Sequence, residues 1–285
     1  MSIWNDLTWV EGIRSHSLSI FFDTVSLAGY PTFLILFISF GYFYWSPSRF
    51  SRVAMMLFIS GLINAFLKDF YQDARPAIEL MLDPKVGTSY GWPSGHSQIA
   101  VTLWGLLAYE LKNKWATFGA ITIIILIAFS RMYLGVHDLG DVFAGLIIGG
   151  LILSIWHYAV INNWYENLSK RSWLMLILFF QLMLYIFYPS HENHELSIWF
   201  LGVMTGWFIG ASNIKIISNP LKKFLTSIFA IFIVFFLLIV ITEIEKGIIA
   251  AGLTGFIFSY CLGMTFSILV TWVIPRLLRL VRLAS

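Results

Sequence analysis

Charged residues are scarce in this sequence, and their scarcity decides its class. Asp, Glu, Lys and Arg make up 12% of its 285 residues, whereas a soluble domain usually carries about 25%. Hydrophobic residues make up 59%. We therefore predict an all-α, polytopic membrane protein whose surroundings include membrane lipids. The net charge of +3 is small, and no nucleic-acid partner is expected.

Cysteine is almost absent as well. The single Cys261 excludes an intramolecular disulfide, so cysteine usage says nothing about the redox compartment. The first residues also lack the basic region and the small-residue cleavage site of a signal peptide, so no cleavable signal peptide is expected.

Long apolar runs are what the sequence has instead. A helix needs about 20 apolar residues to cross a bilayer, and about nine runs approach that length. The expected spans are 27–46, 53–71, 95–111, 115–133, 138–160, 172–189, 196–212, 222–242 and 249–274. Residues 4–24 alternate apolar and polar side chains at roughly helical spacing, which predicts an amphipathic helix on the membrane surface. The alternative for that segment is a soluble tail.

Lys and Arg are unevenly divided between the two sets of loops that nine spans create. Cytoplasmic loops of membrane proteins are rich in these residues. One set holds twelve of the eighteen: Arg49, Arg52, Lys112, Lys114, Lys170, Arg171, Lys215, Lys222, Lys223, Arg276, Arg279 and Arg282. This set is predicted to face the cytoplasm together with the C-terminus. The polar motifs then lie on the opposite side, and compact loops favour a bacterial inner membrane.

The first polar motif is KDFYQDARP, residues 68–76. If the helix continued through it, Lys68 and Arg75 would lie two turns apart on one face, with Pro76 disturbing the helix near its end. Two cations at a membrane surface suit an anion. The alternative is that both side chains only anchor a helix end.

The second motif is YGWPSGHSQ, residues 90–98, directly before an apolar run. Ser94 is placed to cap a helix, and the free N–H groups of a helix start bind phosphate well. Gly95 allows close backbone approach. His96 would lie in the first turn, where it can donate or accept a proton. The alternative is a simple cap beside an exposed histidine.

The third motif is SRMYLGVHDLGDVFAG, residues 130–145. His137 and Asp141 are four residues apart, on one helix face. The carboxylate can bind one ring nitrogen and leave the other free to attack. Arg131 offers a planar fork that suits phosphate. A satisfied polar turn is the alternative, and Asp138 is read as a solvated turn residue.

Small residues follow this third motif. Gly145, Gly149 and Gly150 would let neighbouring helices approach closely. That approach would hold the His137–Asp141 face against the helices that carry Lys68 and His96.

Together the motifs resemble the three signatures of the type 2 phosphatidic acid phosphatase superfamily, and the match is complete. The signatures are lysine, six residues and Arg-Pro; then Pro-Ser-Gly-His; then Ser-Arg, five residues, His, three residues and Asp. The chain looks like an integral membrane lipid phosphate phosphatase. The resemblance covers residues 4–160 and implies a six-helix phosphatase core, so we expect a core over 1–190 and an extension of about three spans over 191–285.

The resemblance also implies roles for the matched residues. His137 would be the nucleophile, Asp141 its orienting partner and His96 the general acid and base. Phosphate would be held by Lys68, Arg75, Ser94, Gly95 and Arg131. No cofactor and no metal are implied. A metal site built from Asp69, Asp73 and Asp138 is a weaker alternative.

The implied substrate is a lipid phosphate or diphosphate, such as a polyprenyl diphosphate, phosphatidylglycerol phosphate or phosphatidic acid, hydrolysed through a phosphohistidine. A lipid phosphotransferase using the same intermediate is the main alternative. A serine hydrolase built on Ser94 would leave the cations without a role, and a transporter with an inactive site would not need complete motifs. The last three spans have no assigned role, and dimerisation is among those open to them.

Overall fold

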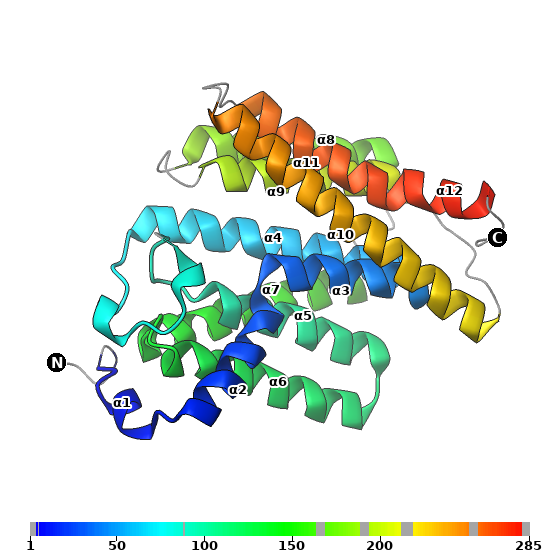
Figure 1. Cartoon of the computed structure of the whole chain (residues 1–285). Helices are drawn as coiled ribbons and strands as arrows, with labels where there is room; N and C mark the ends of the chain where they lie inside the picture. The colour runs from blue at the N-terminus through cyan, green and yellow to red at the C-terminus, as the bar shows by residue number, and fades with distance from the viewer. Residues whose placement is uncertain are drawn as a thin grey trace. The chain divides into compact units, whose positions relative to one another are not determined.

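The computed structural model describes residues 4, 6–87, 89–163, 169–188, 194–211, 219–250 and 256–280. Lys215 and Arg282, two of the predicted cytoplasmic cations, lie outside these residues. All regular secondary structure in the described residues is helical (Figure 1). The α-helices are α1 (Trp9–Ile13), α2 (His16–Ser26), α3 (Pro31–Tyr44), α4 (Pro47–Tyr71), α5 (Gly95–Leu111), α6 (Lys114–Tyr133), α7 (Leu139–Ile161), α8 (Lys170–Phe187), α9 (His194–Gly210), α10 (Pro220–Ala250), α11 (Phe256–Ile268) and α12 (Ile274–Leu280). Short 3-10 turns η1 (Leu27–Gly29), η2 (Ile78–Leu80) and η3 (Pro84–Val86) lie between helices, and a π-helical turn η4 (Leu269–Val273) joins α11 to α12.

Each predicted apolar run overlaps a helix in its described part, but nine membrane crossings are not confirmed. Among the described residues, five helical stretches are long and apolar enough to cross a membrane, and six if one broken pair counts as a span. The five are Pro47–Tyr71, Lys114–Tyr133, Leu139–Ile161, Pro220–Gly247 and Ile257–Arg279. At 17 residues, α5 is about 25 Å long, a little short of the hydrocarbon core.

The predicted surface helix over 4–24 is not confirmed either. The segment forms two helices, α1 and α2, which are separated at Arg14, where the backbone is extended. Ser15 caps α2 by accepting a hydrogen bond from the backbone of Leu18. Together with η1, α2 pairs with α3 as the broken span that passes the length and hydropathy test.

The helices group into two compact units, whose boundaries differ from a division at residue 190. Unit 1 comprises residues 1–33 and 59–168, and unit 2 comprises residues 34–58 and 169–285. Helix α4 passes from one unit into the other. The division into a core over 1–190 and an extension over 191–285 stays a prediction.

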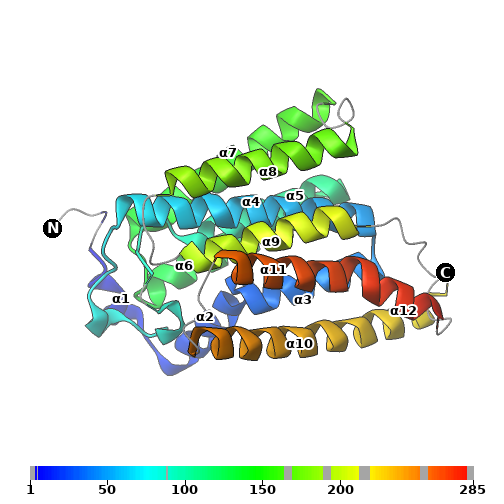
Figure 2. The same cartoon turned by 90° about the horizontal axis from the view of Figure 1, so that it is seen from above.

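In unit 1, α5 packs against both α6 and α7, and α2 packs across α6 (Figures 1 and 2). Glycines allow the α5–α7 approach: a Cβ on Gly145 would lie 2.5 Å from the carbonyl oxygen of Ser94, and one on Gly149 would lie 2.7 Å from that of Gln98. The predicted close approach is therefore confirmed at both positions. It is wrong for Gly150, where a Cβ would meet nothing within 4 Å.

In unit 2, α9 packs along α11 (Figure 2). A Cβ on Gly202 or Gly206 of α9 would collide with the backbone of α11, so small residues set this approach. A buried polar group crosses the same unit: Gln181 Nε2 donates to Thr205 Oγ1 (2.8 Å), and the Tyr260 hydroxyl donates to Gln181 Oε1 (3.2 Å). Mutual hydrogen bonding makes these polar side chains tolerable among apolar helices.

Candidate active site

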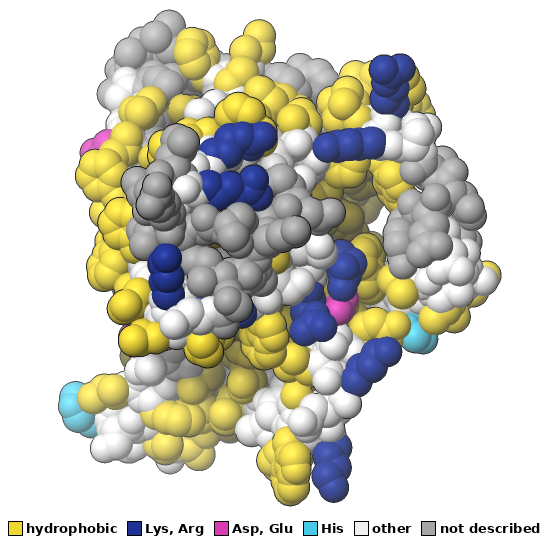
Figure 3. Space-filling model, turned by 90° about the vertical axis from the view of Figure 1, so that its right-hand side faces the viewer, with side chains coloured by type: hydrophobic (Ala, Val, Ile, Leu, Met, Phe, Trp, Pro, Cys, Tyr) yellow, Lys and Arg dark blue, Asp and Glu magenta, His cyan; other side chains and the backbone are white. Residues whose placement is uncertain are grey.

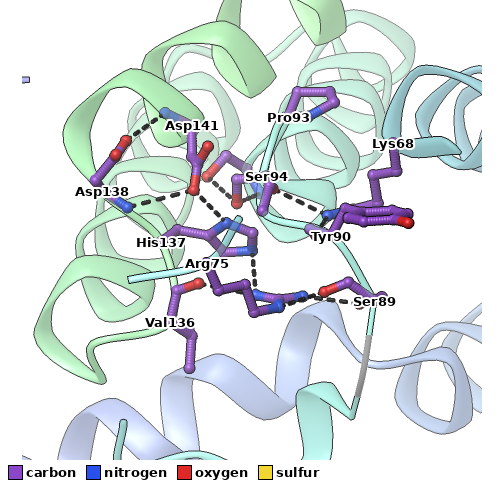
Figure 4. Close-up of polar contacts among 12 residues, drawn as sticks. Lys68, Arg75, Ser89, Tyr90, Pro93, Ser94, Val136, His137, Asp138 and Asp141 are labelled. Atoms are coloured by element: carbon purple, nitrogen blue, oxygen red, sulfur yellow. Dashed lines mark hydrogen bonds and ion pairs between the residues drawn. The ribbon is translucent and has the colours of Figure 1, made fainter. Parts of the chain in front are cut away.

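The centre of the site is a histidine held by the helix that follows it. His137 Nδ1 lies 2.9 Å from Asp141 Oδ2, and both side chains are almost fully buried. Asp138 is the N-cap of α7: its carboxylate accepts from the Asp141 backbone N–H (2.9 Å), and its own N–H donates to Asp141 Oδ2 (3.4 Å) (Figure 4). Asp138 is thus not a merely solvated turn residue, because this capping box also orients Asp141.

Arg75 determines which nitrogen of His137 carries the proton. Arg75 Nη1 lies 3.3 Å from His137 Nε2. A guanidinium can only donate, so Nε2 must be the acceptor and Nδ1 carries the hydrogen that Asp141 accepts. This arrangement leaves the lone pair on Nε2, the nitrogen turned away from the carboxylate.

Four hydrogen bonds hold the Arg75 guanidinium in place. It donates to the Ser89 carbonyl (2.6 Å), the Ser89 hydroxyl (2.8 Å), the Val136 carbonyl (2.8 Å) and His137 Nε2 (Figure 4). The prediction that Lys68 and Arg75 share a helix face is wrong. Helix α4 ends at Tyr71 because Gln72 adopts a left-handed conformation (φ 49°), so Arg75 lies in the following loop.

Lys68, in the last turn of α4, reaches the strand-like segment that precedes α5. Its Nζ donates to the carbonyl oxygens of Gly91 (3.0 Å) and Tyr90. Its side chain is about nine-tenths buried, so its charge acts on the site through a medium that screens it little.

The Pro-Ser-Gly-His motif begins α5 and is joined to the His137 motif through the backbone. The Ser94 N–H donates to the Asp141 carbonyl oxygen (3.0 Å). The predicted cap is confirmed, since Ser94 Oγ accepts from the backbone of Ser97 (3.4 Å). A Cβ on Gly95 would lie 2.8 Å from Asn64 Oδ1, so only glycine lets α5 start this close to α4. His96 Nε2 is buried and has no hydrogen-bond partner among the described residues.

Arg131 is the most deeply buried large side chain of the site, at 0% exposure. Its Nη1 donates to Asp83 Oδ2 (3.0 Å) and to the Ser26 hydroxyl. Its Nε and Nη2 are buried and have no hydrogen-bond partner among the described residues. Five cationic or imidazole side chains thus come together in unit 1: Lys68, Arg75, His96, Arg131 and His137.

These charges change the protonation of the groups they surround. Burial lowers the pKa of His137 well below its usual range, and the charges of Lys68, Arg75 and Arg131 lower it further. Burial, reinforced by the charge of Arg131, lowers the pKa of Arg75 to about 10, which still leaves it cationic at neutral pH. The site therefore combines fixed positive charge with a neutral imidazole, an arrangement that suits a phosphate and a nitrogen nucleophile.

The protonation state of His137 is directly measurable. At pH 6, where an ordinary histidine is mostly protonated, we expect ¹⁵N NMR of histidine-labelled protein to show His137 neutral, with its proton on Nδ1. The lowered pKa means that His137 stays neutral as the pH falls through 6.5 and gains its proton only at lower pH. The spectrum of His137→Gln assigns the signal. A titration midpoint at or above 6.5, or a proton on Nε2, would contradict the geometry described above.

Several residues of the site carry no motif that sequence reasoning could use. Asn64 Nδ2 donates to the Pro93 carbonyl (3.1 Å) and so supports the second motif from α4. Asp83, Ser26 and Ser89 reach the site from loops and from the end of α2. Only Asp138 had a readable signal, because an aspartate three residues before a helical acidic residue is a capping pattern. In the described part of the chain, no three His, Cys, Asp or Glu residues are grouped so as to hold a metal ion.

Part of the chain that carries these motifs is similar to a known protein family. Residues 50–165 match the PAP2 superfamily. The chain is 29% identical to lipid phosphate phosphatase gamma of Arabidopsis thaliana, over 50% of this chain and 58% of that protein. It is 30% identical to phosphatidylglycerophosphatase B of Bacillus subtilis, over 42% of this chain and 62% of that protein. The chain thus spans about three fifths of the length of each relative.

A solved structure is also similar. The transmembrane PAP2-type phosphatidylglycerolphosphate phosphatase of Bacillus subtilis shares 26% identity, with a TM-score of 0.48 over 57% of this chain and 84% of that one. The residues that match the PAP2 superfamily, 50–165, contain all three motifs and every predicted site residue.

Proposed function

We propose that this chain is a membrane-embedded, metal-independent phosphatase that hydrolyses a lipid phosphate or diphosphate through a phosphohistidine. One observation carries the proposal: the buried His137 has Nδ1 2.9 Å from Asp141 Oδ2 and Nε2 3.3 Å from Arg75 Nη1, the geometry expected of a neutral imidazole with its lone pair on Nε2. A nucleophile and an orienting carboxylate next to fixed cations are the parts that phosphoryl transfer needs.

In the first step, His137 Nε2 attacks the phosphorus. A bond forms between Nε2 and phosphorus as the bond from phosphorus to the lipid oxygen breaks. His96, which is protonated once the negative charge of the bound phosphate offsets the neighbouring cations, gives its proton to the departing lipid oxygen, which leaves as an alcohol, or as a monophosphate when the substrate is a diphosphate. Lys68, Arg75, Arg131, Ser94 and the backbone of Gly95 bind the phosphate oxygens, where negative charge accumulates.

In the second step, water replaces the histidine. His96, now neutral, takes a proton from water as the oxygen attacks phosphorus and the bond to Nε2 breaks. Inorganic phosphate leaves, His96 is again protonated, and His137 recovers its lone pair. Throughout, Asp141 keeps the proton of His137 on Nδ1 and stabilises the positive charge that the ring carries in the phosphohistidine.

The substrate is proposed to be a lipid because the site lies among apolar helices and the relatives are named as lipid phosphatases. A lipid tail can stay in the bilayer while its phosphate enters the polar site. Polyprenyl diphosphate, phosphatidylglycerol phosphate and phosphatidic acid all meet this requirement.

The site is proposed to face the outside of a bacterial inner membrane. In unit 1, Lys112 caps the end of α5 and Lys114 begins α6, whereas the site lies at the opposite ends of both helices. Lys and Arg predominate among the charged side chains of the face seen in Figure 3. Under the positive-inside rule, the end of unit 1 that carries Lys112 and Lys114 faces the cytoplasm, and the site faces away from it.

Phosphate release by purified full-length protein in detergent, with EDTA present, tests the proposal. The panel contains polyprenyl diphosphate, phosphatidylglycerol phosphate and phosphatidic acid, with glucose 6-phosphate as a soluble phosphate. We expect release from at least one lipid, inhibition by orthovanadate and little release from the sugar. No release from any lipid, or activity only when a divalent metal replaces EDTA, would overturn the proposal. Labelled phosphate recovered on a lipid or sugar acceptor would identify a phosphotransferase instead.

A further inference from the structure

The two edges of the Arg131 guanidinium differ in their hydrogen bonds to the described residues. Nη1 donates to Asp83 Oδ2 and Ser26 Oγ, whereas Nε and Nη2 have no partner among the described residues although both are buried. The Nε–Nη2 edge is a two-donor fork that matches two oxygens of a phosphate. A buried donor without a hydrogen-bond partner costs free energy. This edge therefore suits a ligand, which could bind there without breaking the hydrogen bonds of Nη1.

Asp83 is the residue that fixes the bonded edge. It lies in the loop between α4 and α5, and its side chain, like that of Arg131, is completely buried. Burial alone raises the pKa of Asp83, but the hydrogen bond from Tyr30 and the charge of Arg131 outweigh burial and lower it. Asp83 is therefore a carboxylate at neutral pH. A buried ion pair of this kind fixes orientation more surely than it adds stability.

Tyr30 connects this ion pair to the general acid. Its hydroxyl donates to Asp83 Oδ2, the same oxygen that accepts from Arg131. Its ring lies edge-on to the ring of His96, with centroids 4.6 Å apart at 82°. Gly29, just before it, lies so close to the His96 ring that a Cβ there would collide with it. The turn between α2 and α3 therefore packs against His96 while Tyr30 bonds the partner of Arg131.

We propose that Asp83 and Tyr30 are positioning residues of this site: Asp83 holds Arg131 by one edge so that its Nε–Nη2 fork faces the phosphate, and Tyr30 orients both Asp83 and His96. The inference rests on the proposed phosphatase function. Neither residue belongs to the three motifs, and Tyr30 precedes the residues that match the PAP2 superfamily. The site of this protein thus extends beyond its family domain into the N-terminal segment.

A double-mutant cycle separates positioning from a general effect on folding. Asp83→Asn keeps the shape of the side chain and removes its charge. We expect it to lower kcat/KM about 10- to 100-fold and to raise the inhibition constant of orthovanadate similarly, because a small displacement of a phosphate ligand has this size of effect. In an Arg131→Lys background, where the fork is already lost, the same change should cost less than about threefold, because Asp83 acts through Arg131.

Two further variants keep the test decisive if Asp83→Asn folds poorly. Tyr30→Phe keeps the ring against His96 and removes only the hydroxyl, so it should raise the orthovanadate inhibition constant about 3- to 10-fold at unchanged thermal stability, as expected for one hydrogen bond. Asp23→Asn, at an exposed carboxylate paired with Lys85, is the matched control and should change neither quantity more than twofold.

The outcomes divide clearly. Two results would overturn the positioning role while leaving wild-type activity intact. One is a loss of kcat/KM on Asp83→Asn that is equal in the wild-type and Arg131→Lys backgrounds. The other is an orthovanadate inhibition constant that is unchanged in both Asp83→Asn and Tyr30→Phe. A wild-type protein that neither releases phosphate nor binds orthovanadate would instead overturn the phosphatase function on which the inference rests.

Discussion

Replacing His137 by glutamine is expected to lower kcat for phosphate release at least about 10⁴-fold, since removing a nucleophile costs most of the catalysis that a site provides. Glutamine is close in size to histidine and can still hydrogen-bond Asp141, so the fold should persist. The measurement is phosphate release from the preferred lipid, together with trapping of labelled protein quenched in base, where a phosphohistidine survives. Wild type should retain label and His137→Gln should not.

The matched control lies on the same helix. His157→Gln in α7 makes the identical substitution at an exposed histidine, whose ring lies edge-on to that of Tyr109. We expect activity within twofold of wild type. Retention of phosphate release by His137→Gln would eliminate the phosphohistidine mechanism, and full activity with label trapped elsewhere would move the nucleophile to another residue.

Replacing Arg75 should have the next largest effect. Arg75→Gln removes a charge next to the attacking nitrogen and should lower kcat/KM about 10²- to 10³-fold, the usual cost of losing one donor to the transition state. Arg75→Lys should recover little, because one ammonium group cannot reach Ser89, Val136 and His137 at once as the guanidinium does. Initial rates over a range of substrate concentrations measure both variants.

Lys85→Gln provides the comparison for Arg75. Lys85 lies in the same loop, but its side chain is half-exposed and pairs with Asp23, so its removal should change kcat/KM less than threefold. Wild-type activity in Arg75→Lys would show that charge alone is needed at this position, and the proposed geometric role of the guanidinium would then be wrong.

The three motifs could be recognised in the sequence because the residues that interact within them lie close together along the chain. His137 and Asp141 meet through the helical period, and Ser94 caps the helix that its own sequence begins, so both contacts follow from spacing alone. Gly145 and Gly149 also correctly predicted a close approach between helices. The helix that carries His96 was expected as a partner, but nothing in the spacing says that α7 meets α5 at Ser94 and Gln98.

The predictions that the structure contradicts or does not confirm have physical explanations too. Lys68 and Arg75 were expected on one helix because helical spacing relates them, but Gln72 ends α4 three residues earlier. The predicted surface helix over 4–24 depends on an apolar stripe, and part of that stripe is buried inside the protein, since Leu7 and Val10 are almost fully buried. Apolar periodicity shows that a face is covered, but it does not say whether lipid or protein covers it.

Sequence alone determined that this protein is helical, suited to a membrane and similar in its motifs to phosphatases, because composition, apolar run length and motif spacing are properties of the chain itself. Only the tertiary structure decided how the cations are held. Arg131 meets Asp83 across 48 positions of sequence, and Tyr30 meets His96 across 66. Such contacts depend on how helices and loops pack, which no local pattern records. The motifs name the groups that are proposed to react, whereas packing decides which edge of the Arg131 guanidinium has no hydrogen-bond partner among the described residues.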